Sequence, residues 1–133
     1  MGQVEKQAVV YLVDDDDSVR KAIGRLLRTN GYGVREFETP DEFLACAAEE
    51  TPACVLLDIT MPGLSGLQVQ ARLNERGTWW PVIAVSARED ESAREASRHL
   101  GARLFLRKPV DALALLDAIA WISTSAGSGR QPG

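Results

Sequence analysis

Five polar residues have the types and positions needed for chemistry on a phosphoryl group, and each closely follows a short apolar run. They are Asp14, Asp15, Asp58, Ser86 and Lys108. Neighbouring carboxylates repel one another unless a cation joins them, and Mg²⁺ prefers carboxylate oxygens. A hydroxyl and an ammonium can then bind phosphoryl oxygens, and a carboxylate can act as the nucleophile. Taken alone, however, an aspartate after an apolar run more often caps a helix or closes a turn.

The apolar runs indicate buried strands, and the segments between them have helical spacing. Strands are expected at 8–13, 33–37, 53–57, 81–85 and 103–106, and helices at 19–30, 40–50, 65–75, 89–100 and 111–123. This alternation favours an α/β fold with right-handed crossovers and a parallel sheet. The three most apolar strands must be central, as in the flavodoxin-like order 2-1-3-4-5. Such a (βα)5 three-layer sandwich would bring the polar residues to one rim, at the carboxyl ends of the strands.

Local patterns predict how some of the helices begin and which side chains they expose. Thr39 fits the N-cap of the second helix, with proline and glutamate in its first turn. In the acidic run 14–17, Asp17 is expected to cap the first helix rather than bind a cation. His99, the single histidine, is expected at the surface. Trp121 lies roughly opposite the apolar stripe of the last helix, with Leu113 nearby, and either contacts a partner or packs on a neighbouring loop.

Composition excludes several classes of protein. With 133 residues, 45% apolar and 26% charged, the chain is expected to form one globular domain. A net charge of −4 gives no nucleic-acid footprint, and no apolar run is long enough to span a membrane. Cys46 and Cys54 lack metal-site spacing and are expected as free thiols in the cytoplasm. We expect a lead-in at 1–7, the domain at 8–123 and a flexible, linker-like tail at 124–133.

Four segments, in this order and spacing, resemble the receiver domain of two-component response regulators. They are Val13-Asp14-Asp15, residues 57–66 (LDITMPGLSG), Val85-Ser86-Ala87 and residues 105–109 (FLRKP). Each segment alone is a weak match, but the ordered set is specific and extends over about residues 8–123. The chain most resembles the receivers of the nitrogen-fixation regulator group, which usually carry a helix-turn-helix DNA-binding domain.

The resemblance implies roles for the acids. Asp58 would be the phosphoacceptor, receiving a phosphoryl group from the phosphohistidine of a sensor histidine kinase. Asp15 would bind Mg²⁺ directly, with Mn²⁺ as a substitute, whereas Asp14 would hold the ion chiefly through water. The backbone carbonyl of Thr60 would complete the protein ligands. Thr60 and Arg88 occupy positions that set the lifetime of the phosphoryl group, and we expect Arg88 to shield it from water.

The resemblance also implies a switch. Ser86 would bond the phosphoryl group and move with it, while Lys108 would pair first with Asp58 and then with a phosphoryl oxygen. The bond from Lys108 to Pro109 is expected to be cis. Phe105 takes the place of the switch aromatic, without a hydroxyl group. The surface of the fourth helix, fifth strand and last helix would then control an output domain or a partner, or form a homodimer.

Four interpretations stay open at this point. The chain could be a stand-alone receiver that passes on a phosphoryl group or binds a partner, or the cut portion of a transcription regulator. A haloacid-dehalogenase-like phosphatase would be a true enzyme, but it needs a second aspartate where Thr60 stands. A receiver-like scaffold that is never phosphorylated is disfavoured by the intact acids, Ser86 and Lys108. For a receiver, self-catalysed phosphorylation and autodephosphorylation are expected, without turnover of an external substrate.

Overall fold

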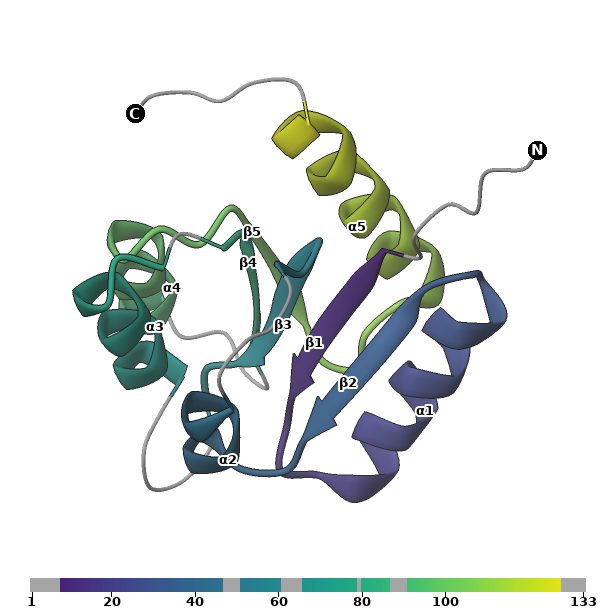
Figure 1. The fold of residues 1–133 in the computed structure, drawn as a ribbon, viewed down its shortest axis with the longest axis horizontal. Helices are drawn as coiled ribbons and strands as arrows, with labels where there is room; N and C mark the ends of the chain where they lie inside the picture. The colour runs from purple at the N-terminus through teal and green to yellow at the C-terminus, as the bar shows by residue number, and fades with distance from the viewer. Residues whose placement is uncertain (1–7, 47–50, 61–65, 79, 87–90, 128–133) are drawn as a thin grey trace.

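Five parallel strands in the order β2-β1-β3-β4-β5 form the sheet of the molecule, as the sequence predicts (Figure 1). The computed structural model describes residues 8–46, 51–60, 66–78, 80–86 and 91–127. The elements in chain order are β1 (Val9–Val13), α1 (Asp17–Thr29), β2 (Gly33–Phe37), α2 (Pro40–Ala45), β3 (Cys54–Asp58), α3 (Gly66–Glu75), β4 (Val82–Ser86), α4 (Glu91–His99), β5 (Leu104–Arg107) and α5 (Ala112–Gly127). Within the described residues, no helix is both long and apolar enough to cross a membrane.

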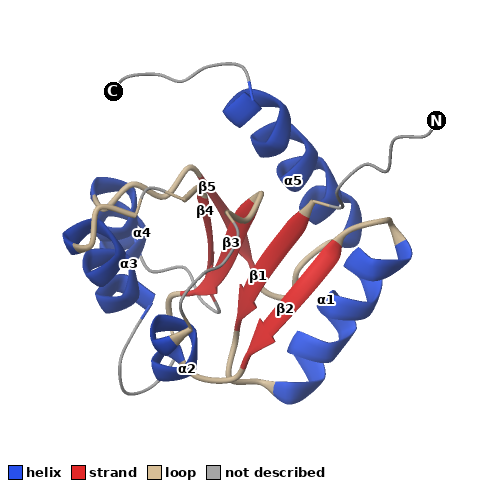
Figure 2. Cartoon of the chain, in the orientation of Figure 1, coloured by secondary structure: helices blue, strands red, loops and turns tan. Residues whose placement is uncertain are grey.

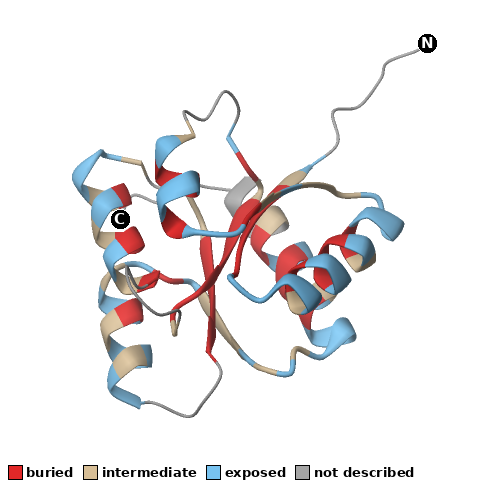
Figure 3. Cartoon of the chain, turned by 90° about the horizontal axis from the view of Figure 1, so that it is seen from below, coloured by how far each residue is buried: buried red, intermediate tan, exposed pale blue. Residues whose placement is uncertain are grey.

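Helices cover both faces of the sheet and create two apolar cores (Figure 2). Side chains of α1 and α5 pack on one face, and those of α2 and α3 pack on the other, with α4 beside α3. Strands β3 and β4 are buried along their whole length, because successive side chains enter opposite cores (Figure 3). The confirmed strand order follows from this, since only central strands are covered on both faces.

Aromatic side chains fill the core under α2. Tyr11 packs edge-to-face against Phe37, Phe43 and Trp80, with ring centroids 5.5 to 6.1 Å apart. Trp80 is therefore a packing residue, whereas its neighbour at position 79 lies outside the described residues. His99 is at the surface as predicted, where its Nε2 lies 3.3 Å from a carboxylate oxygen of Glu95.

Helix ends differ from the sequence prediction at three places. Asp16, not Asp17, caps α1, because Asp16 has extended backbone and accepts a hydrogen bond from the Val19 N–H at 3.1 Å. Helix α2 starts at the predicted Thr39 cap but ends at Ala45 rather than near residue 50, since Cys46 returns to extended backbone. Helix α5 continues past the predicted end at 123 to residue 127.

Polar side chains join α3 to α4 where an apolar seam would be usual. The hydroxyl of Ser97 donates to Oε1 of Gln70 at 2.7 Å, and Nε2 of Gln70 donates to the Ser97 carbonyl at 3.1 Å. Both residues are buried. One turn further along α3, the Asn74 amide donates to the Leu100 carbonyl at 3.1 Å. Because these groups lie out of water, their hydrogen bonds fix how the two helices sit against each other.

We predict that Ser97→Ala lowers the free energy of unfolding by about 1–3 kcal/mol, because it removes the donor to a buried amide oxygen of Gln70. Urea denaturation of the two proteins measures the difference. Ser18→Ala, at an exposed position of α1, is the matched control and should change stability by less than roughly 0.5 kcal/mol. Equal stability of the two variants would contradict the assigned contact.

Candidate functional site

The strand register places four of the five predicted residues at one edge of the sheet. Val13 pairs with Leu57, and Asp58 pairs with Val85, so the strand ends of β1, β3 and β4 are level. A polar residue stands at this level of each strand: Asp14 directly after β1, Asp58 at the end of β3 and Ser86 at the end of β4. Lys108 follows β5 at the same edge, where its backbone N–H donates to the Ser86 carbonyl at 2.9 Å. Carboxyl edges of this kind are the usual ligand sites of open α/β sheets.

Three carboxylates converge at this edge, as predicted. Asp14, Asp15 and Asp58 each offer an oxygen within 4.8 Å of the others. Asp14 and Asp58 are buried, with 2% and 3% of their surface exposed, whereas Asp15 is open to solvent. Burial makes the repulsion between charged carboxylates stronger, so this cluster needs positive charge nearby.

Lys108 supplies one positive charge by bridging two of the acids. Its Nζ lies 2.9 Å from Oδ2 of Asp58 and 3.1 Å from Oδ2 of Asp14. The peptide between Lys108 and Pro109 is cis, which confirms the expectation from the family resemblance. The contacts of Nζ with Asp14 and Asp58 show that the side chain of Lys108 turns inward to the ends of β1 and β3, although its backbone lies beside the end of β4.

The second oxygen of each buried carboxylate is held by nearby backbone. Oδ1 of Asp58 accepts the Thr60 N–H at 2.8 Å and the Thr60 hydroxyl at 2.9 Å. Oδ1 of Asp14 accepts the Asp16 N–H at 2.9 Å. Each carboxylate thus has one oxygen fixed by its own loop and the other shared with Lys108, which limits its rotation.

Burial and charge act against each other in this cluster. Burial raises the pKa of Asp14 above its usual value, although the Asp16 N–H and Lys108 oppose that shift. Burial by itself lowers the pKa of Lys108, but the hydrogen bonds and charges of Asp58 and Asp14 outweigh it, so the net pKa is raised. Lys108 therefore stays an ammonium at neutral pH.

The donor set fits Mg²⁺. Three carboxylates face one ammonium, so two negative charges remain when all four groups are ionised. A divalent cation balances that charge, and carboxylate oxygens are the ligands that Mg²⁺ prefers. Thr60 lies beside Asp58, but its carbonyl as a further ligand stays a prediction.

The predicted switch residues lie on β4 and β5, the two strands after β3 in the sheet. Ser86 is buried at the end of β4. Phe105 is half-buried in β5, where it packs on the core of the α2–α3 face, and the Arg94 guanidinium carbon lies 5.2 Å above its ring. Arg88 lies outside the described residues. Movement of Ser86 or Phe105 on phosphorylation stays a prediction.

The exposed pair predicted on the last helix is exposed in the structure. Leu113 shows 71% and Trp121 53% of its surface to solvent. The Arg103 guanidinium carbon lies 6.0 Å from the Trp121 ring, so this tryptophan has a neighbour within the chain. A contact of this surface with a partner stays a prediction.

Two residues that position the site were not singled out in the sequence. A Cβ atom on Gly66 would lie 2.5 Å from the Asp58 carbonyl oxygen and 2.6 Å from Cα of Ile59, so only glycine lets α3 approach the end of β3 this closely. Arg20 is buried in α1 and donates to the Asp14 carbonyl at 2.7 Å. Its spacing of three and seven residues from Ile23 and Leu27, both buried, was the available signal.

Comparisons with known proteins agree with this site. The family model described as the response regulator receiver domain matches residues 10–120. The chain is 36% identical over 123 residues to the transcriptional regulatory protein FixJ of Azorhizobium caulinodans, covering 92% of this chain and 58% of that protein. It is 40% identical over 112 residues to the transcriptional regulatory protein TdiR of Thauera aromatica, covering 84% and 49%. The chain therefore spans about half the length of these curated relatives.

A solved structure shares both sequence and fold with the chain. The response regulator receiver protein from Burkholderia phymatum is 38% identical, with a TM-score of 0.77, and the match covers 89% of this chain and 96% of that one. The family model, the curated relatives, the strand order and the acidic cluster all agree. The chain thus belongs to the receiver domain family of two-component response regulators.

Proposed function

We propose that Asp58 is the phosphoacceptor of this receiver. The observation that carries the proposal is the position of its carboxylate, which is buried, bonded to Lys108 and within 4.8 Å of Asp14 and Asp15. A carboxylate oxygen of Asp58 attacks the phosphorus of a kinase phosphohistidine, the phosphorus–nitrogen bond breaks, and an acyl phosphate forms. The histidine nitrogen takes up a proton as it leaves.

The other rim residues hold charge in place during this transfer. Asp15 would bind Mg²⁺ directly, Asp14 would hold it chiefly through water and the Thr60 carbonyl would be a further ligand, with Mn²⁺ as a substitute. The ion would supply positive charge for the phosphoryl oxygens. Lys108 then releases Asp58 and binds a phosphoryl oxygen. Its hydrogen bond to Oδ2 of Asp58 already places the ammonium close enough for this exchange.

The new charge is the signal. The phosphoryl group draws the Ser86 hydroxyl toward it, and the ring of Phe105 follows into the space behind. We infer a shift between two packings of α4, β5 and α5, with Leu113 and Trp121 on the surface that a partner, a second copy or an output domain reads. Neither Cys46 nor Cys54 forms a disulfide, which agrees with a reducing compartment such as the cytoplasm.

The output proposed here is control of transcription. The relatives FixJ and TdiR are named as transcriptional regulatory proteins, and this chain matches about half of each. We propose that the receiver domain expected at 8–123 extends to the end of α5 at residue 127, and that the linker to the effector, expected at 124–133, starts after it. A sensor histidine kinase is the proposed phosphodonor.

The experiment that tests Asp58 is intact-mass spectrometry after mixing the protein with a small acyl phosphate and Mg²⁺. We expect one phosphoryl group on the wild type, none in EDTA and none on Asp58→Asn. Asp16→Asn is the matched control, since it removes a neighbouring acid while asparagine keeps the helix cap, and it should still be labelled. Labelling of Asp58→Asn would refute the assignment, and continuous release of phosphate without an adduct would favour the phosphatase.

We further predict that Arg88→Ala shortens the life of the acyl phosphate, because it removes a side chain expected to shield the phosphoryl group from water. A change of about tenfold corresponds to ~1.4 kcal/mol on the barrier to hydrolysis. Loss of the label with time after removal of the donor gives the rate. Arg98→Ala, at an exposed position of α4, is the control and should leave the rate at the wild-type value. An unchanged rate for Arg88→Ala would contradict the shielding role.

A further inference from the structure

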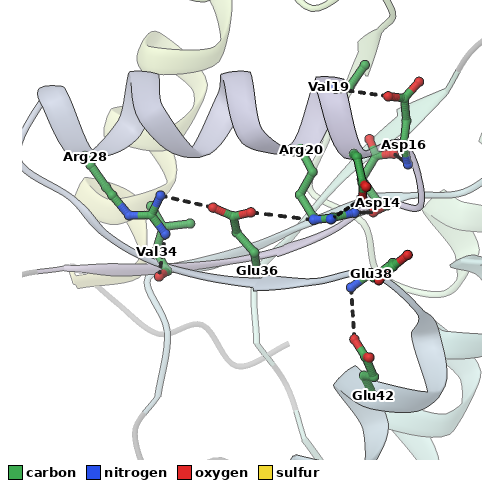
Figure 4. Close-up of polar contacts among 10 residues, drawn as sticks. Asp14, Asp16, Val19, Arg20, Arg28, Val34, Glu36, Glu38 and Glu42 are labelled. Atoms are coloured by element: carbon green, nitrogen blue, oxygen red, sulfur yellow. Dashed lines mark hydrogen bonds and ion pairs between the residues drawn. The ribbon is translucent and has the colours of Figure 1, made fainter.

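Arg20 is the one arginine among the buried residues that the structure describes, and the proposed chemistry gives it no role. Only 7% of its surface is exposed. It lies in the second turn of α1, on the side that faces β1 and β2 (Figure 4). Burying a guanidinium is unfavourable unless its donors are paired, so its partners show what the position is for.

The partners of Arg20 come from three different elements. Nη1 donates to the backbone carbonyl of Asp14, just after β1, at 2.7 Å. Nη2 pairs with the carboxylate of Asp17 in the first turn of α1. Nε lies 3.5 Å from Oε1 of Glu36 on β2. The planar guanidinium thus ties the acidic turn to the helix that follows it and to the neighbouring strand.

The packing around Glu36 keeps this guanidinium in place. Figure 4 shows Glu36 between Arg20 and Arg28, and its other oxygen lies 3.0 Å from the Arg28 guanidinium. A Cβ atom on Gly24 would lie only 2.5 Å from that same oxygen. An alanine there would displace only the end of the Glu36 side chain, so the two arginines, rather than the glycine, hold Glu36 in this position.

Asp14 is held at every polar group. Its N–H donates to the Phe37 carbonyl at 3.2 Å, its carboxylate contacts the Asp16 N–H and Lys108, and its carbonyl accepts from Arg20. The carbonyl belongs to the peptide plane that leads into Asp15. Holding that carbonyl therefore sets the direction in which the chain presents Asp15 beside Asp14.

We propose that Arg20 is a positioning residue for the cation site: through the Asp14 carbonyl it fixes the turn that presents the Asp14 and Asp15 carboxylates. The proposal rests on the proposed function, since it concerns the affinity of the acidic cluster for Mg²⁺. Arg20 touches neither the ion nor the phosphoryl group and acts through the backbone alone.

The charge of Arg20 and its position predict effects of opposite sign. If Arg20 acted only as a nearby positive charge, removing it would tighten the binding of Mg²⁺, because a repulsion would be lost. If it acted only on stability, the affinity would stay unchanged wherever the protein is folded. If it positions the acids, the affinity falls, as it does when the outer partners of metal ligands are removed.

The test is an NMR titration of ¹⁵N-labelled protein with Mg²⁺ at a temperature where every variant is folded. We expect the Kd of Arg20→Gln to rise roughly tenfold. Arg28→Gln is the matched control, because it removes an equal charge from the same helix and the same glutamate but does not reach Asp14; its Kd should stay within about twofold of wild type. Arg20→Lys keeps the charge but not the planar set of donors, and its Kd should lie between those of the wild type and of Arg20→Gln.

The same samples without metal provide a second readout. In Arg20→Gln the Asp16 amide, which donates to Asp14, should exchange with deuterium faster, while core amides such as those of Leu56 and Ile83 keep their wild-type rates. Unchanged or tighter Mg²⁺ binding by Arg20→Gln would overturn the proposal. If Arg20→Gln does not fold, a wild-type Kd for Arg20→Lys would overturn it. If the wild type itself binds no Mg²⁺, the proposed function fails, and the Asp16 exchange alone decides whether Arg20 orders the turn.

Discussion

The ammonium of Lys108, shared between Asp14 and Asp58, is the interaction on which the rim depends. The strand order makes β1 and β3 neighbours, so their terminal acids meet whatever their charge. Two buried carboxylates at this separation would otherwise favour protonation or a wider edge. Lys108 directly follows β5, the edge strand of the sheet, so its ion pairs with Asp14 and Asp58 link that edge to the central strands. Lys108 thus holds together two acids that the topology brings close and that their own repulsion would push apart.

Two cationic side chains contact Asp14: Lys108 binds its carboxylate and Arg20 binds its carbonyl. The two side chains differ in ways that suit these different contacts. Lys108 is a point charge on a flexible stem and contacts the carboxylate, so it can change partners without loss of geometry. Arg20 is a rigid fork and contacts the carbonyl, so it suits a fixed attachment. One side of this aspartate is therefore exchangeable, and the other is anchored in the packing of α1 on β2.

The sequence predicts the sheet order and the convergence of the acids because both follow from strand periodicity and from the rule that parallel strands share a carboxyl edge. The sequence does not predict features that depend on the exact path of the backbone. Any member of the run 14–17 could cap a helix, and Asp16 does so because its backbone is extended and its side chain accepts the Val19 N–H, whereas Asp17 already lies within α1. Arg20 resembles a surface charge until its spacing from Ile23 is noticed. The need for Gly66 arises from the close approach of α3 to the Asp58 carbonyl, which only the folded chain creates.

Helix α4 is the helix whose displacement would expose the least buried apolar surface. Of its described residues only Ser97 is buried, whereas α5 buries four, which include Leu115 and Ile119. Moving α4 exposes little apolar surface, so water resists the motion weakly. Its hydrogen bonds to Gln70 and Asn74 hold it in place, but each contributes only about 0.5–1.5 kcal/mol net, because water offers equivalent bonds once the helix has moved. Helix α5 is thus held by apolar packing, whereas α4 is held mainly by hydrogen bonds that water can replace. The free energy of local opening should therefore be lower for α4 than for α5.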